Sequence, residues 1–168
     1  KQFHDENVDF LSNILLKNKK HNLNNVFFTG NSGAEACEAA YRLALQYFDN
    51  QEINSKKKIF ISRKQSYHGC TDLCINLGDR PNNNSFAFKN KFFKKINEHN
   101  PINKIEKNET IEEYEDRTVK ELEDKIKKIG AENICGFIGE TIMGGLQGDI
   151  PPTKNYCKKI RKLCNKFN

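Results

Sequence analysis

Long apolar runs are missing from this sequence, which has no tryptophan, one methionine and four prolines among its 168 residues. No stretch is long and apolar enough to cross a membrane, and no secretory leader is recognisable. The six cysteines form no Cys-x-x-Cys pair, which favours reduced thiols over a disulfide framework. We therefore expect a cytoplasmic protein, one domain with a hydrophobic core, no metal site and no membrane partner.

Neither sign of charge dominates, because 28 Lys and Arg stand against 22 Asp and Glu, a formal net charge of +6. Lysines cluster at residues 56–58 and 89–95, and the second cluster is interleaved with Phe86, Phe88, Phe92 and Phe93. Basic and aromatic side chains alternate in this way on nucleic-acid-binding surfaces. Lysine and asparagine are frequent throughout the chain, however, so a solvated surface is the expectation and no nucleic-acid partner is predicted.

Hydrophobic periodicity predicts strands and helices in alternation. Short apolar runs predict strands at residues 26–29, 59–62 and 134–139. Apolar residues at helical spacing predict helices around residues 8–15, 37–48, 122–129 and 156–167. Residues 78–110 are polar and without period, which predicts a long irregular excursion. This alternation is typical of an α/β fold with a mainly parallel sheet and flanking helices.

Three unusual loops follow the predicted strands: GNSGAEA from Gly30, SYHG from Ser66 and ETIMGG from Glu140. In a parallel sheet, such loops share the edge where ligands bind. The first N–H groups of a helix attract an anion, most often a phosphate, and Gly33 lets a ligand approach the backbone. Together with Tyr67 and the Glu140 carboxylate, this edge would suit a flat, phosphorylated, cationic ring.

Each of these residues also has a plainer interpretation. Ser32 can simply cap the helix, with Glu35 as its capping-box partner. Tyr67 can fill the core beneath its loop, and Glu140 can be a turn carboxylate. We expect His68 to be a hydrogen-bonded neighbour of the site rather than a proton carrier. The alternative function that stays open is a self-contained, non-catalytic α/β module that binds a phosphate ligand or a nucleic acid.

The segments VFFTGNSGAEACEAAYRLA, SYHG and GETIMGGLQGDIPP, followed by a helix reading YCKKIRKLC, resemble the class III (ω-type) aminotransferases in order and spacing. These are pyridoxal-phosphate enzymes of fold type I. The resemblance covers nearly all of the chain and implies that residues 1–168 are part of a large, cofactor-binding domain, with the N-terminal segment and the C-terminal half of the family outside it. It also implies a homodimeric transaminase that acts on an amine or amino acid and a keto acid.

The resemblance further implies a role for each site residue. Ser32, Gly33 and Ala34 match the loop that binds the cofactor phosphate, and Tyr67 matches the aromatic residue that stacks on the pyridine ring. His68 completes that motif. Glu140 matches the glutamate behind the cofactor.

No catalytic residue is expected within this chain. The lysine that forms the Schiff base and the aspartate that keeps the ring nitrogen protonated are expected beyond Asn168, so we expect the chain alone to be inactive. One position departs from part of the family: Gly145 stands where ornithine and aminobutyrate aminotransferases carry a glutamate that pairs with a mobile arginine. This resembles the β-alanine, taurine or aliphatic amine branch.

Overall fold

The computed structural model describes residues 5–17, 23–30, 32–52, 55–85 and 89–167. In this part of the chain, three parallel strands form a sheet in the order β2-β1-β3. The strands are β1 (Ile59–Arg63), β2 (Phe93–Ile96) and β3 (Ile134–Ile138), and the helices are α1 (Glu6–Lys17), α2 (Gly33–Gln51), α3 (Asp72–Leu77), α4 (Pro81–Asn84), α5 (Ile111–Ile129) and α6 (Tyr156–Phe167), with a 3-10 turn at Ala131–Asn133.

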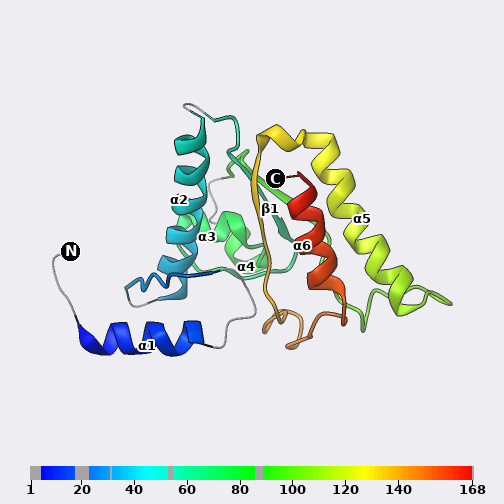
Figure 1. Ribbon diagram of the computed structural model, residues 1–168. Helices are drawn as coiled ribbons and strands as arrows, with labels where there is room; N and C mark the ends of the chain where they lie inside the picture. Colours follow the sequence, from blue (N-terminus) through cyan, green and yellow to red (C-terminus); the bar gives the residue numbers. More distant parts are fainter. Residues whose placement is uncertain (1–4, 18–22, 31, 53–54, 86–88, 168) are drawn as a thin grey trace.

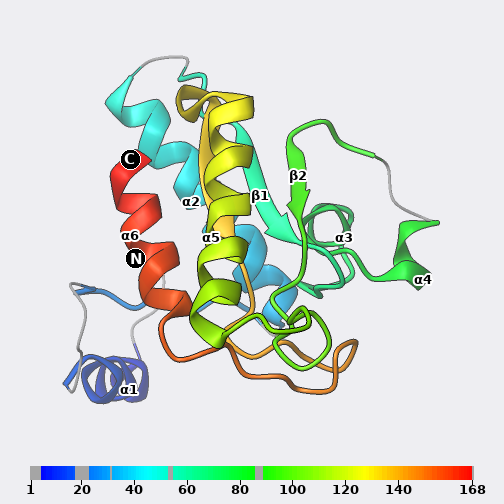
Figure 2. The same cartoon turned by 90° about the vertical axis from the view of Figure 1, so that its right-hand side faces the viewer.

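The sheet lies between two layers of helices, with α2 and α3 over one face and α5 and α6 over the other (Figure 1, Figure 2). Side chains alternate along a strand, so Ile61 and Phe60 of β1 face opposite layers. Ile61 is fully buried in a cluster with α5 and α6, and Phe60 is buried in a second cluster with α2, α3 and β3. The α/β fold with a mainly parallel sheet and flanking helices is confirmed.

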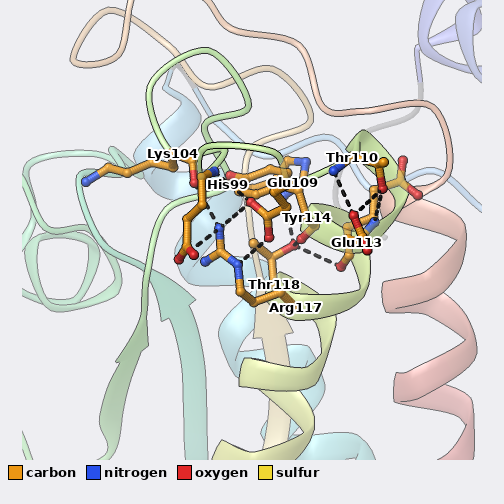
Figure 3. Close-up of polar contacts among 10 residues, drawn as sticks. His99, Lys104, Glu109, Thr110, Glu113, Tyr114, Arg117 and Thr118 are labelled. Carbon is orange, nitrogen blue, oxygen red and sulfur yellow. Dashed lines mark hydrogen bonds and ion pairs between the residues drawn. The ribbon is translucent and has the colours of Figure 1, made fainter.

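The ends of α5 follow from its local sequence. Thr110 caps the first turn, since its hydroxyl accepts a bond from Glu113 N while the Glu113 carboxylate accepts one from Thr110 N. Figure 3 shows this pair beside Arg117, whose Nε lies 2.6 Å from Glu109 Oε1. Gly130 ends the helix with a φ of 90°, a conformation that glycine adopts without strain.

The prediction of a strand at residues 26–29 is wrong, because a strand needs a neighbour for its N–H and C=O groups and these residues pair with none of the described strands. The prediction that residues 78–110 are irregular missed β2. This strand pairs in parallel with β1, with Phe93 opposite Phe60. It was missed because two of its four residues are lysines.

The basic, aromatic stretch at residues 89–95 is not a continuous surface. Lys95 points inward from β2, and its Nζ donates to Ser62 Oγ at 2.7 Å and to the carbonyl oxygens of Asn76 and Leu77 at 2.7 and 2.6 Å. Burial lowers the pKa of Lys95 to about 8. Phe93 packs against Tyr41 of α2. Phe86 and Phe88 lie outside the described residues.

Helix α1 forms where its apolar spacing predicts, but it lies outside the three layers (Figure 1). Its apolar side chains are exposed to solvent, with exposed fractions between 43% for Val8 and 67% for Phe10. None of the described helices is long and apolar enough to cross a membrane. The thiols of Cys74 and Cys135 are buried, whereas those of Cys70 and Cys157 are exposed.

Candidate functional site

The loop that follows β1 touches the start of α2. Tyr67, His68 and Gly69 belong to this loop, and Gly69 has a φ of 125°. A Cβ atom at Gly69 would lie 2.6 Å from Ala34 Cβ, so the two backbones approach each other closely there. Cys74 Sγ also donates to Ala34 O at 3.5 Å. The structure therefore brings the loop that carries Tyr67 and His68 against Ala34, although the two segments are far apart in the sequence.

The start of α2 has the geometry of an anion-binding site. Ser32 is the N-cap, and its Oγ accepts a bond from Glu35 N at 3.2 Å. The space beside the Gly33 Cα atom is unoccupied, because a Cβ atom there would meet nothing within 4 Å. The first N–H groups of a helix have no partner within it and carry the positive end of the helix dipole. Asn31, from the same loop, lies outside the described residues.

The loop that follows β3 brings a carboxylate to the same place. Glu140 Oε1 accepts a bond from Tyr67 N at 3.4 Å. Glu140 Oε2 is buried and has no hydrogen-bond partner among the described residues. Tyr67 is 43% exposed, and Arg80 Cζ lies 5.4 Å from its ring centroid. Tyr67 is thus not a core residue beneath its loop, and the plainer interpretation of it does not hold.

His68 is buried in cationic surroundings. Burial and, to a smaller extent, the nearby charges of Lys95 and Arg63 lower its pKa to about 4. The imidazole is consequently neutral at pH 7. Its Nε2 atom is buried and lacks a partner within the described part of the chain, which leaves one ring nitrogen available to a bound group.

Arg63, the last residue of β1, was missed as a site residue. Its side chain is 2% exposed, and its Nη2 donates to the backbone carbonyl of Glu140. The guanidinium also lies against Gly139 and over the Tyr156 ring. A signal was present in the sequence, because Arg63 directly follows a buried strand just as Glu140 follows β3. Arg63 holds the Glu140 backbone against β1.

The comparisons with known proteins fit this arrangement. A model of the family described as Aminotransferase class-III matches residues 1–168. An uncharacterized aminotransferase of Schizosaccharomyces pombe is 34% identical over 171 residues, which cover 98% of this chain and 36% of that protein. A probable γ-aminobutyrate transaminase of Oryza sativa, named as mitochondrial, is 33% identical over 162 residues, which cover 96% of this chain and 31% of the relative.

A solved structure shares the fold. The ω-transaminase from Pseudomonas jessenii in complex with PMP superposes with a TM-score of 0.87 and 34% identity, over 99% of this chain and 36% of that one. The chain spans about a third of the length of these relatives. Because the family model matches residues 1–168 and these relatives align with nearly all of the chain, the chain belongs to the class III aminotransferase family.

Proposed function

We propose that the protein containing this chain is a pyridoxal-phosphate-dependent aminotransferase and that residues 1–168 are part of its cofactor-binding domain. The observation that carries the proposal is the convergence of the α2 start, Tyr67 and Glu140 at one place in the fold. These groups complement a phosphate, a flat ring and the polar edge of that ring. The buried, unpaired Glu140 Oε2 supports the fit, because such an atom is costly unless a bound group satisfies it.

In this proposal each residue has a defined task. Ser32, Gly33 and Ala34 bind the phosphate through the N–H groups and dipole of the first turn of α2. Tyr67 stacks on the ring and sets its plane. Glu140 lies at the polar edge of the ring. His68, which is neutral at pH 7, offers a hydrogen bond without adding charge.

When bound, pyridoxal phosphate supplies the electron sink for moving an amino group from an amine or amino acid to a keto acid. The direct test uses the full-length protein. Pyridoxal phosphate is titrated against it by absorbance, and transfer is then assayed with panels of amine donors and keto acid acceptors. We expect saturable binding with one site per chain and transfer from at least one donor. A full-length protein that neither binds the cofactor nor transfers an amino group would contradict the proposal.

Replacing Tyr67 by alanine should weaken cofactor binding about twofold to tenfold, because aromatic stacking is worth about 0.5–1.5 kcal/mol beyond burial. Tyr67→Phe keeps the ring and should bind the cofactor nearly as the wild type does. Tyr47→Ala is the matched control, since Tyr47 is 59% exposed on α2. Equal dissociation constants for Tyr67→Ala and the wild type would show that Tyr67 does not contact the ring.

We further propose that the apolar face of α1 packs against a second copy of the protein. Leu11, Ile14 and Leu15 share one face of this helix and are 45–53% exposed. Apolar patches of this kind usually mark an interface. Light scattering on the full-length protein should give a dimer, and the double variant Leu11→Glu, Leu15→Glu should shift it towards the monomer. A wild type that is monomeric at micromolar concentration would exclude this interface.

A further inference from the structure

Three side-chain amides form a polar bridge across the loops that follow all three strands. Asn100, after β2, donates from Nδ2 to Gln147 Oε1 at 2.6 Å. Gln147, after β3, donates from Nε2 to Gln65 Oε1, and Gln65 follows β1. We define these residues as the amide bridge. Gln147 is its central member, because an amide can accept one bond and donate another at the same time.

Both ends of the amide bridge are held firmly. Asn100 is 1% exposed, and its Oδ1 accepts bonds from Ile102 N at 3.1 Å and Asn103 N at 3.0 Å. Gln65 N donates to Asp79 Oδ2 at 3.1 Å, and Gln65 has a φ of 52°. The Asn100 side chain and the Gln65 backbone are therefore held in place, and the Gln147 side chain, which is bonded to both residues, is restrained by them.

Gln147 lies at the tip of a short hairpin. Met143 and Ile150 pair in antiparallel fashion at its base through bonds of 2.9 and 3.0 Å, and both side chains are buried. Gln147 N donates to Gly144 O at 2.9 Å, which closes the tip. Glu140 is three residues before this base. The hairpin therefore acts together with Arg63, which binds the Glu140 carbonyl, in setting the position of the Glu140 side chain.

The Glu140 backbone is bound by Arg63, but its carboxylate has only a long hydrogen bond to the β1 loop. The bond from Tyr67 N to Glu140 Oε1 is 3.4 Å long, close to the outer limit of hydrogen bonding. Gln65, two residues before Tyr67, is bound to the hairpin by Gln147. We propose that Gln147 is a positioning residue: through the amide bridge it fixes the hairpin against the β1 loop and so keeps Glu140 beside Tyr67. The inference rests on the proposed function, because these two residues are the ones assigned to the cofactor ring.

The first test needs no cofactor. Hydrogen exchange is measured on the cofactor-free, full-length wild type, on Gln147→Ala and on the control Gln51→Ala, which changes an exposed glutamine at the end of α2. We expect exchange in residues 65–69 to be about fivefold faster in Gln147→Ala and unchanged in the control. A fivefold change corresponds to about 1 kcal/mol, as expected for loss of the one side-chain bond that reaches the β1 loop, from Gln147 to Gln65. Gln65→Ala should have the same effect, and the double variant should add little, because both changes break the same bridge.

The second test measures cofactor affinity. Gln147→Ala should weaken binding of pyridoxal phosphate by about threefold to tenfold, whereas Gln51→Ala should not. Unchanged exchange at residues 65–69 in Gln147→Ala would overturn the inference. A lower unfolding midpoint without a selective change in those residues would also overturn it, because Gln147 would then only stabilise the fold as a whole. A wild type that fails to bind the cofactor would refute the proposed function alone, since the exchange measurement would still decide the role of Gln147.

Discussion

Replacing Gly69 by alanine is expected to destabilise the protein by on the order of 2–4 kcal/mol and to weaken cofactor binding by at least about tenfold. Gly69 has a φ of 125°, where a side chain is strained. The added methyl group would also lie 2.6 Å from Ala34 Cβ and 3.0 Å from Ala34 Cα. These atoms belong to the helix itself, so only a relative shift of α2 and the β1 loop relieves the contact. That shift would carry Ser32 and Gly33 away from Tyr67.

The matched control is Gly145→Ala, in which the new methyl group would meet nothing within 4 Å. Its unfolding free energy should stay within about 0.5 kcal/mol of the wild type. Unfolding free energies are measured with denaturant on the full-length proteins, and cofactor dissociation constants are measured by absorbance titration. If Gly69→Ala matches the wild type in both measurements, the close approach of the β1 loop to α2 does not exist.

Much of the fold could be predicted because its signal is periodic. The apolar residues of α5, α6, β1 and β3 recur at helical or strand spacing, and those positions are the ones that the two cores bury. Strand β2 gave no such signal, since it is short and its Lys95 points inward to satisfy carbonyl groups of α3. Residues 26–29 have the composition of a strand but form none, because composition cannot show whether a neighbouring strand is there to pair with them.

The candidate site was predictable only in part. Tyr67, His68 and Glu140 stand in loops that directly follow β1 and β3, and the topology of a parallel sheet brings such loops to one edge. The amide bridge was not predictable, because its members are 47 and 82 residues apart and no period relates them. Their partnership depends on backbone turns that only the folded chain defines. The cofactor roles assigned to these residues stay predictions.

A second buried histidine, His99, is expected to make stability depend steeply on pH between about pH 6.5 and pH 4. His99 is 1% exposed, and burial lowers its pKa to about 4, with the charge of Arg63 lowering it and that of Glu115 raising it. The ring stacks on Tyr156 at 3.6 Å, and Nδ1 lies 3.2 Å from Thr118 Oγ1, part of the cluster in Figure 3.

The geometry agrees with a neutral ring. Thr153 N donates to His99 Nε2 at 3.4 Å, so this nitrogen is an acceptor in the folded protein. Protonation would place a hydrogen there that faces this N–H group, with the Thr153 hydroxyl at 3.1 Å as the acceptor beside it. The charged groups around the ring are Arg63 of β1 and Glu115 of α5, and Glu115 is itself paired with Lys159 at 3.1 Å. The carboxylate is therefore a weak stabiliser of a protonated imidazole.

The sign of the effect follows from which state, folded or unfolded, binds the His99 proton at the higher pH. The unfolded chain takes up a proton at His99 near the ordinary pKa of 6.5, whereas the folded protein does so only near 4. The stabilising contribution is therefore complete above about pH 6.5 and is lost as the pH falls towards 4. Between pH 7 and pH 5 the loss should be about 2 kcal/mol from His99, and His68, with the same shift, should lose about as much.

The measurement compares denaturant unfolding of the full-length wild type and His99→Gln at pH 7 and pH 5. We expect the variant to be less stable at pH 7 but to lose about 2 kcal/mol less than the wild type on acidification, because it no longer carries the buried imidazole. Glu109 and Glu123, whose pKa values are lowered to about 2 by Arg117 and by Lys166 and Lys127, titrate below this window. Equal losses in the two proteins would mean that His99 is already protonated, or exposed to water, in the folded protein at pH 5.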